Sequence, residues 1–246
     1  MSDRVAVITG ASSGIGEATA KALAGEGYAV VLAARREERI NELAEEIRSG
    51  GAKALAVPTD VSDPAEAHAL INTAKNELGS VDVLVNNAGV MLLGPILGAD
   101  LEHWQRMVNV NVLGLMYCTH AALPIMHEQS SGHIVNVSSV AGRVARMGSG
   151  AYNATKWGVG AFSESLRQEA LNYNVRVTIV EPGFVDTELQ GHNDLPMVVE
   201  ALKQAKEEAG KVLEAQDIAN AIVYAVEQPE HVSINEVLVR PTKQRG

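Results

Sequence analysis

The sequence has one cysteine, few aromatic residues and no long apolar run. Its 246 residues include only Cys118 as a thiol, which excludes an intramolecular disulfide and a thiolate metal cage. No stretch approaches the roughly 18 uninterrupted apolar residues of a membrane span, and no basic leader with an apolar core precedes Arg4. Basic side chains number 20 against 30 acidic ones, and the formal charge of −10 argues against nucleic-acid or polybasic membrane binding. We expect a soluble, cytoplasmic protein without nucleic-acid or membrane partners.

Short β-branched runs alternate with helical patterns along the chain. Segments between the runs, such as residues 37–48 and 65–78, carry apolar residues three and four apart, with charged residues on the other face. This alternation is typical of a parallel sheet covered by helices on both faces. We therefore predict an α/β fold: a Rossmann-type, doubly wound, parallel seven-stranded sheet in a single domain over residues 1–246. The predicted strands span residues 5–8, 29–33, 54–57, 81–85, 133–137, 175–180 and 236–239.

Three further segments predict a lid and two long helices. Residues 193–210 combine a proline, many charges and a helical pattern late in the chain, which predicts an inserted lid at about residues 187–212. Two long helices are predicted from about residue 100 to 129 and from about 150 to 174. Both have apolar residues on more than one face, consistent with the sheet on one side and a partner subunit on the other.

A glycine-rich turn follows the first predicted strand. Its glycines allow a tight turn and the close approach of a pyrophosphate, whose charge is met by free N–H groups at the start of the next helix. The alternative is a plain strand-to-helix turn. The position after the first strand of an alternating chain favours a dinucleotide site. The predicted phosphate-binding residues are Gly10, Ser12, Ser13, Gly14, Ile15 and Gly16.

Two arginines follow the second predicted strand, where an NAD-binding fold usually offers an acidic residue to the ribose 2′-hydroxyl. A guanidinium holds a 2′-phosphate through two parallel charge-assisted hydrogen bonds, so Arg35, helped by Arg36, favours NADP(H) over NAD. The alternative is a pair of solvated arginines at a helix start. Asp60, after the third strand, is a candidate acceptor for the adenine amino group or a cap for the following helix.

Ser139, Tyr152 and Lys156 form the sharpest constellation. Tyr152 and Lys156 are four residues apart and share a helix face, where an ammonium favours the phenolate and lowers the pKa of the phenol from about 10. Such a phenol is a general acid or base. Ser139, at the end of the fifth strand, is placed to donate to the same carbonyl oxygen. A tyrosine and a lysine at this spacing are common by chance, but their conjunction with Ser139 favours a catalytic site.

Taken together, these motifs resemble those of the short-chain dehydrogenases/reductases. The resemblance extends over nearly the whole chain, and several motifs in the right order are more specific than any one of them. The matching elements are Thr9 to Gly16, Asp60-Val61, Asn86-Asn87-Ala88-Gly89, Asn111-Val112-Leu113-Gly114, Ser139, Tyr152 with Lys156, and Pro182-Gly183 with Thr187.

The resemblance implies strand order 3-2-1-4-5-6-7 and a role for each matching residue. Tyr152 would protonate a carbonyl oxygen as hydride arrives, Lys156 would bind the nicotinamide ribose, and Ser139 would orient the substrate. Asn111 would hold a water connecting Lys156 to solvent. The remaining cofactor-binding residues implied are Asp60, Val61, Asn87, Ala88, Gly89, Pro182, Gly183, Val185 and Thr187, together with Tyr152 and Lys156.

The implied activity is that of an NADPH-dependent oxidoreductase. It would transfer hydride reversibly between nicotinamide and a small ketone, aldehyde or 3-oxo/3-hydroxy acid, as a carbonyl reductase or alcohol dehydrogenase acting on CH–OH groups. A homotetramer or homodimer built on the two long helices is the family's usual assembly. The alternatives are an NAD-linked secondary alcohol dehydrogenase and a non-catalytic dinucleotide-binding sensor.

The similarity is greatest to the NADP-dependent branch that contains 3-hydroxy-acid (serine) dehydrogenases and clavulanic-acid dehydrogenase, although the tail after residue 239 departs from the common family pattern. Arg143 and Arg146 are candidates for binding a substrate carboxylate, or else structural side chains. No paired histidine motif is present, and we expect no catalytic metal. The apolar candidates for the substrate pocket are Leu93, Val140, Met147, Phe184, Leu189 and Met197.

Overall fold

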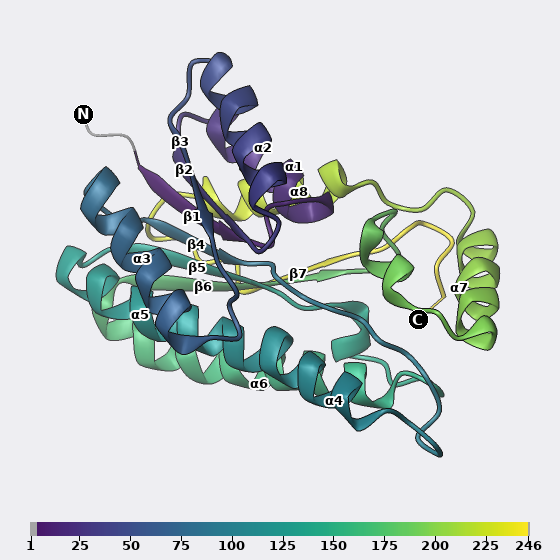
Figure 1. Ribbon diagram of the computed structural model, residues 1–246. Helices are drawn as coiled ribbons and strands as arrows, with labels where there is room; N and C mark the ends of the chain where they lie inside the picture. Colours follow the sequence, from purple (N-terminus) through teal and green to yellow (C-terminus); the bar gives the residue numbers. More distant parts are fainter. Residues whose placement is uncertain (1–3, 246) are drawn as a thin grey trace.

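A sheet of seven parallel strands forms the centre of the molecule (Figure 1). The computed structural model describes residues 4–245. Its strand order is β3-β2-β1-β4-β5-β6-β7, which confirms the predicted doubly wound fold. The strands are β1 (Val5–Thr9), β2 (Ala29–Ala34), β3 (Ala54–Pro58), β4 (Val83–Asn86), β5 (Gly132–Val137), β6 (Val175–Pro182) and β7 (Glu236–Val239).

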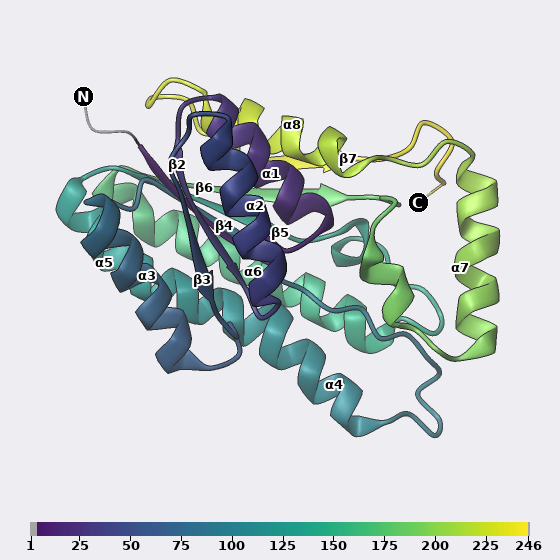
Figure 2. The same cartoon turned by 45° about the horizontal axis from the view of Figure 1, so that its top comes forward.

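Helices cover both faces of this sheet (Figures 1 and 2). One face carries α1 (Gly14–Gly25), α2 (Glu37–Ser49) and α8 (Ala215–Val226). The other carries α3 (Pro64–Leu78), α5 (Leu115–Gln129) and α6 (Gly150–Ala170), which runs on as a short 3₁₀ turn, η3 (Leu171–Tyr173).

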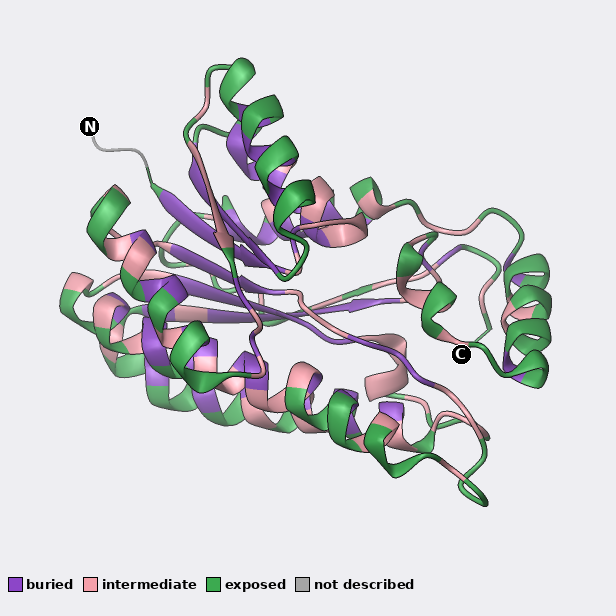
Figure 3. Ribbon diagram, in the orientation of Figure 1, coloured by how far each residue is buried: buried purple, intermediate pink, exposed green. Residues whose placement is uncertain are grey.

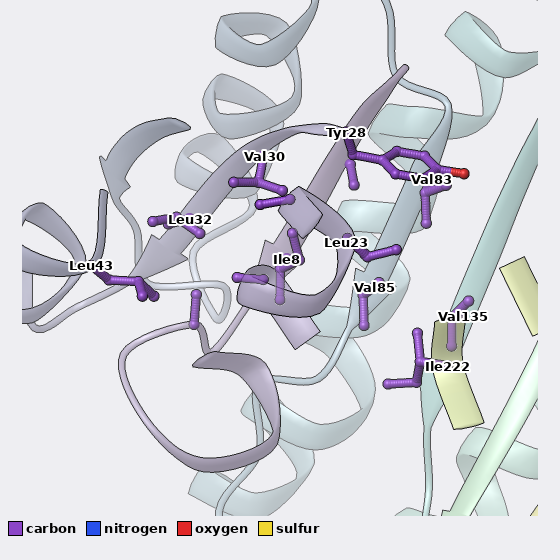
Figure 4. Packing of buried hydrophobic residues seen from close by; sticks show 14 of the residues in the cluster. Ile8, Leu23, Tyr28, Val30, Leu32, Leu43, Val83, Val85, Val135 and Ile222 are labelled. Carbon is purple, nitrogen blue, oxygen red and sulfur yellow. The ribbon is translucent and has the colours of Figure 1, made fainter. Parts of the chain in front are cut away.

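Alternation along the strands divides the core into two layers. In β1, Ala6 and Ile8 pack toward α1, α2 and α8, whereas Val5 and Val7 pack toward α3, α5 and α6. Figure 4 shows Ile8 in the first layer beside Leu23 of α1, and Figure 3 shows buried strands between helices whose outer faces are exposed. Burial of both strand faces explains why the strands read as continuous apolar runs rather than alternating ones.

The predicted long helix over residues 100–129 is interrupted. It consists of α4 (Leu101–Val108), a π-helical segment η1 (Asn109–Gly114), and α5. The combined run Leu101–Gln129 is the one helix among the described residues with the length and mean hydropathy, 1.2, of a membrane span. Core helices of globular proteins pass the same test, and α5 packs on α3 while η1 packs on α6, so this single segment is weak support for a span.

The segment between β6 and α8 holds the predicted lid. It contains a 3₁₀ helix, η4 (Glu188–His192), and α7 (Pro196–Ala209), which stands to one side of the sheet in Figure 2. Its base is fastened by Asn193, whose Oδ1 accepts from Leu93 N at 2.7 Å and whose Nδ2 donates to Met91 O at 3.1 Å. The base of the segment is therefore tied to the loop that follows β4.

Strands β1 and β4 are neighbours whose connections leave toward opposite faces of the sheet. The chain after β1 enters α1 on one face, and the chain after β4 leads to α4 on the other. A crevice opens at such a switch point, outside the carboxyl ends of the strands, where ligands of open α/β sheets bind.

Candidate active site

The glycine-rich turn after β1 packs directly against the loop after β4. Gly10 has φ +67°, and a Cβ at this position would lie 2.8 Å from Ala88 Cα. The side chain of Asn87 stabilises the turn, because its Nδ2 donates to Thr9 O at 3.0 Å and to Gly10 O at 3.3 Å. The Thr9 hydroxyl accepts from the backbone N–H groups of Asn87 and Ala88, both at 3.0 Å. The two predicted cofactor loops are thus one hydrogen-bonded unit.

The start of α1 is available to an anion. Ser13 is the N-cap residue, and its side chain makes no capping hydrogen bond to the helix. The first N–H groups of α1 therefore retain the partial positive charge that attracts phosphate.

A cleft of about 300 Å³ lies at the carboxyl ends of the strands. It brings together all but two of the predicted site residues. The exceptions are Asn111 and Gly16, which do not line it. Gly16 instead packs inside the turn, where a Cβ would overlap Gly10 O and lie 2.6 Å from Asn87 Nδ2. The predicted residues that line the cleft are Gly10, Ser12, Ser13, Gly14, Ile15, Arg35, Arg36, Asp60, Val61, Asn87, Ala88, Gly89, Ser139, Tyr152, Lys156, Pro182, Gly183, Val185 and Thr187.

Of the two arginines after β2, Arg36 makes the closer contacts with the glycine-rich turn. Its Nε and Nη2 donate to Ser12 Oγ at 2.9 and 2.8 Å, and its Nη2 donates to Ser13 Oγ at 2.6 Å. Arg35 keeps a 58% exposed side chain, with its Nη1 4.0 Å from Asp60 Oδ2. Arg36 therefore contacts the turn, whereas Arg35 has a mostly exposed side chain, and the predicted binding of a 2′-phosphate by Arg35 with help from Arg36 stays a prediction.

Asp60 faces the cleft and does not cap α3. Its Oδ1 accepts from Ser62 N at 3.0 Å and from Ser62 Oγ at 2.7 Å, whereas Asp63 is the N-cap and accepts from Ala65 N at 2.7 Å. Burial alone favours the neutral acid, but the bonds from Ser62 hold the pKa of Asp60 below its ordinary value. The carboxylate is an acceptor on the adenosine side of the predicted site.

Tyr152 and Lys156 lie side by side on α6, and both are 6% exposed. Lys156 Nζ donates to Val137 O at 3.0 Å and lies 5.8 Å from the centroid of the Tyr152 ring. Ser139, at the N-cap of η2 (Val140–Gly142), accepts from Ala141 N at 3.1 Å and donates to Pro182 O at 3.5 Å, and its hydroxyl is near enough to the Tyr152 phenol to act on the pKa of that phenol. The three predicted catalytic side chains therefore meet in the cleft.

The ionisation of the pair differs from the sequence-based expectation. Burial raises the pKa of Tyr152 to about 12, although the hydrogen bond with Ser139 acts in the opposite direction. Burial also lowers the pKa of Lys156 to about 8. In the protein alone, desolvation of the phenol outweighs the effect that is expected of the lysine on its pKa. Tyr152 is therefore a protonated hydrogen-bond donor at neutral pH.

Asn111 is positioned by the π-helical segment η1. It is 2% exposed; its Oδ1 accepts from Val90 N at 2.8 Å, and its Nδ2 donates to Val90 O at 2.9 Å and to Thr155 Oγ1 at 3.2 Å. The side chain thus joins the loop after β4 to α6 beneath the cleft. Its predicted water link to Lys156 stays a prediction.

The loop after β6 closes the cleft on its remaining side. Thr187 packs on the glycine-rich turn, because a Cβ at Gly14 would lie 3.1 Å from Thr187 Cγ2. The C-terminal tail supports this loop: Gln244 Oε1 accepts from Phe184 N at 2.8 Å, and a Cβ at Gly183 would overlap the same oxygen. The C-terminal tail is therefore part of the support of the site.

Several residues that line the cleft were not among those predicted from the sequence. Those at strand ends follow from the rule that ligands bind beyond the carboxyl ends of the strands. Glu188 and His192 had no comparable cofactor signal, because they belong to the inserted segment. Of the six apolar candidates for the substrate pocket only Leu189 lines the cleft, and Met147 and Met197 are 104% and 67% exposed. The missed lining residues are Ala33, Ala34, Thr59, Val90, Val110, Val137, Ser138, Glu188, Gln190 and His192.

These residues fit a nicotinamide dinucleotide. The uncapped start of α1 and the close approach at Gly10 suit a pyrophosphate, the arginines suit an anionic adenosine end, and Tyr152 and Lys156 lie at the other end of the cleft. Within residues 4–245, no three His, Cys, Asp or Glu side chains gather in the manner of a metal site.

Comparison with known proteins also leads to proteins that bind a nicotinamide dinucleotide. Residues 4–196 match the family described as short chain dehydrogenase. An uncharacterised oxidoreductase of Staphylococcus saprophyticus is 42% identical over 244 residues, which cover 98% of each chain.

Two solved structures extend this likeness to the fold and the ligand. The closed form of a serine dehydrogenase complexed with NADP⁺ has a TM-score of 0.91 and 33% identity, covering 98% of this chain and 96% of that one. A short-chain dehydrogenase/reductase from Burkholderia phymatum in complex with NAD has a TM-score of 0.87 and 32% identity, covering 96% and 88%. With most of its length matched by the family and nearly all of it by these relatives, the chain belongs to the short-chain dehydrogenases, oxidoreductases that bind a nicotinamide dinucleotide.

Proposed function

We propose that the protein is an NADPH-dependent carbonyl reductase that also runs in reverse as an alcohol dehydrogenase on CH–OH groups. Its substrates are small ketones or aldehydes, and 3-oxo/3-hydroxy acids are the charged alternative. The observation that carries the proposal is the meeting of Ser139, Tyr152 and Lys156 in the cleft that also holds the glycine-rich turn and two arginines. A protein that only senses a dinucleotide has no need of a buried tyrosine and lysine pair.

The proposed chemistry assigns a proton-transfer role to Tyr152. The phenol holds its proton at neutral pH, because burial raises its pKa to about 12, and it donates that proton to a carbonyl oxygen during reduction. Ser139, in the same cleft, orients the same oxygen. When bound, NADPH supplies the hydride.

Lys156 has two roles in the proposed mechanism: it binds the cofactor, and it acts on the charge of the neighbouring Tyr152. Its ammonium donates to Val137 O and keeps further donors for the nicotinamide ribose. A cation in this place also favours the phenolate that remains after proton transfer, which is the form needed for oxidation of an alcohol.

The surroundings of Tyr152 favour an uncharged substrate. Tyr152 packs in an apolar cluster with Val90 and Met107, and Leu189 packs against that cluster. Arg143 is committed to a buried carboxylate, since its Nε donates to Glu181 Oε2 at 2.6 Å. A carbonyl flanked by alkyl or aryl groups therefore suits the site better than one beside a carboxylate.

The other candidate carboxylate-binding arginine is also engaged. Arg146 Nη2 donates to Arg245 O at 2.8 Å in the C-terminal tail. The serine dehydrogenase with NADP⁺ bound supports the NADP-dependent branch for this chain, while the contacts of both arginines favour a substrate other than an amino acid.

An NAD-linked secondary alcohol dehydrogenase is the second candidate. The relative from Burkholderia phymatum has NAD bound, and Arg36 is already engaged by the turn and by Glu188. The single cysteine, Cys118, is buried and reduced, which suits the cytoplasm in either case.

The first test is the loss of NADPH or NADH absorbance against a panel of aldehydes, diketones, 3-oxo esters and carboxylate-bearing ketones. We expect turnover with NADPH to exceed turnover with NADH, with uncharged substrates preferred. Tyr152→Phe is expected to lower kcat by at least about a hundredfold, the scale of a general acid, and to leave the Kd of NADPH within about twofold. A Tyr152→Phe variant that keeps full activity would exclude the proposed mechanism, and Tyr173→Phe, outside the cleft, is the matched control.

A further inference from the structure

Glu188 joins the inserted segment to the arginines beside the glycine-rich turn. Its Oε2 lies 2.6 Å from Arg36 Nη1, and its Oε1 lies 2.8 Å from Arg39 Nη1. These partners are 152 and 149 residues away along the chain. Glu188 and Arg36 both line the cleft, so the ion pair lies within the predicted cofactor site.

The guanidinium of Arg36 is almost fully engaged. Of its five N–H groups, Nε and Nη2 supply three bonds to the hydroxyls of Ser12 and Ser13, and Nη1 binds Glu188. A phosphate group that uses Arg36 must therefore exchange with one of these partners. Glu188 is the only charged partner among them, and it binds Arg36 through one oxygen, Oε2, while its Oε1 binds Arg39.

Glu188 remains ionised throughout the physiological range. Hydrogen bonds from Arg36 and then from Arg39 lower its pKa to about 2. Arg35, by contrast, has Asp60 at 4.0 Å as its ion-pair partner and presents a mostly exposed side chain at the rim. The cluster thus offers a phosphate one loosely held arginine, Arg35, and a second, Arg36, that shares the single carboxylate of Glu188 with Arg39.

We propose that Glu188 is a specificity-determining residue that competes with the cofactor 2′-phosphate for Arg36 and so limits the preference for NADPH over NADH. The inference rests on the proposed NADP-binding function. A 2′-hydroxyl carries no charge, so NADH binds without displacing Glu188. A 2′-phosphate must share Arg36 with a carboxylate or push it aside, and it meets the repulsion of that carboxylate in either case.

The test compares the affinities of the two cofactors in Glu188→Gln, which removes the charge and keeps the shape. We expect the Kd of NADPH to fall about three- to fivefold, the range of an exposed ion pair, while the Kd of NADH changes by less than about twofold. Adenosine 2′,5′-bisphosphate and 5′-AMP are titrated in parallel by calorimetry, because they isolate the phosphate contribution from the nicotinamide end. The gain is expected to shrink at high salt.

Two variants serve as controls. Glu45→Gln removes a carboxylate that binds Arg48 at 2.7 Å on α2, outside the cleft, and is expected to leave both affinities unchanged. Glu188→Asp keeps the charge and is expected to keep the NADPH affinity within about twofold of the wild type.

The outcomes separate this inference from the proposed function. Weaker NADPH binding in Glu188→Gln, an equal change for both cofactors, or no change would overturn the competition. Arg35→Asp tests the 2′-phosphate site itself: if that variant leaves the ratio of NADPH to NADH affinity unchanged, the NADP assignment fails. If the ratio of NADPH to NADH affinity depends on Arg35 but not on Glu188, the competition by Glu188 is rejected and the NADP assignment stands.

Discussion

At the residue scale, His133 shows how burial fixes a protonation state. It lies in β5 and is 2% exposed, with its Nε2 2.7 Å from Thr178 Oγ1. That hydroxyl donates its single hydrogen to Ile234 O, so it accepts from His133 Nε2, which therefore carries a proton. Among the described residues, Nδ1 has no hydrogen-bond partner. Burial, with the nearby charge of Arg176, lowers the pKa of His133 to about 3.

This depressed pKa makes the stability depend on pH. The unfolded chain takes up a proton near pH 6.5 and the folded chain does not until about pH 3, so the contribution is present above about pH 6.5 and is lost on acidification. Between about pH 7 and pH 5 we expect the wild type to lose about 2 kcal/mol more free energy of unfolding than His133→Gln, measured by urea titration. His231→Gln, at an exposed position, is the control and should behave as the wild type. If the free energy of unfolding changes with pH in the same way in the wild type and in His133→Gln, His133 does not cause the pH dependence.

Which residues of a site touch one another depends on side-chain directions that the sequence does not encode. The sequence predicts a cationic site after β2, but not that Arg36 crosses to Ser12 and Ser13 while Arg35 stays at the rim. It likewise places Tyr152 and Lys156 on one helix face without showing that both are desolvated. Desolvation comes from the surrounding fold, and it changes the direction in which the pKa of Tyr152 moves.

At the element scale, the glycine-rich turn is the most constrained part of the fold. A methyl group at Gly16 would overlap Gly10 O and approach Asn87 Nδ2, so Gly16→Ala must push the turn away from the loop after β4. We expect a loss of about 1–3 kcal/mol in the free energy of unfolding and weaker cofactor binding. Gly25→Ala, in the same helix with no atom within 4 Å of the new methyl group, is expected to be neutral or to stabilise by up to about 1 kcal/mol. Equal effects of the two substitutions on urea unfolding would contradict this account.

The strands and most helices could be predicted because their apolar patterns are strong, whereas η1 could not. A π-helical segment of six residues shifts the hydrogen-bond partner by one position, which the apolar pattern of the surrounding helix did not reveal. Its effect is to bury Asn111 against Val90 and Thr155. The strand order was predicted from the family resemblance, because alternating patterns alone do not define which strands are neighbours.

At the scale of the whole molecule, large apolar side chains are exposed on helices of the face opposite α1, α2 and α8. Trp157 of α6 and Val108 of α4 are 53% and 45% exposed. Large apolar side chains exposed on the long helices favour the proposed homodimer or homotetramer, in which a partner covers them. We expect Trp157→Glu to dissociate the assembly and lower its mass in size-exclusion chromatography with light scattering. Asn41→Glu adds the same charge to exposed α2 and is expected to leave the mass unchanged, and a wild-type monomer at low concentration would contradict the proposal.

The contact of the tail with the loop after β6 has a practical consequence for preparing the protein. Gln244 accepts from Phe184 N, so a purification tag attached after residue 245 would be close in sequence to a residue that supports the cleft. The first residue of β1, Val5, lies at the amino ends of the parallel strands, whereas the cleft lies at their carboxyl ends. A removable tag at the amino end is therefore the better choice for measuring kinetics, and a difference in activity between the two tagged forms would report how far the tail supports the site.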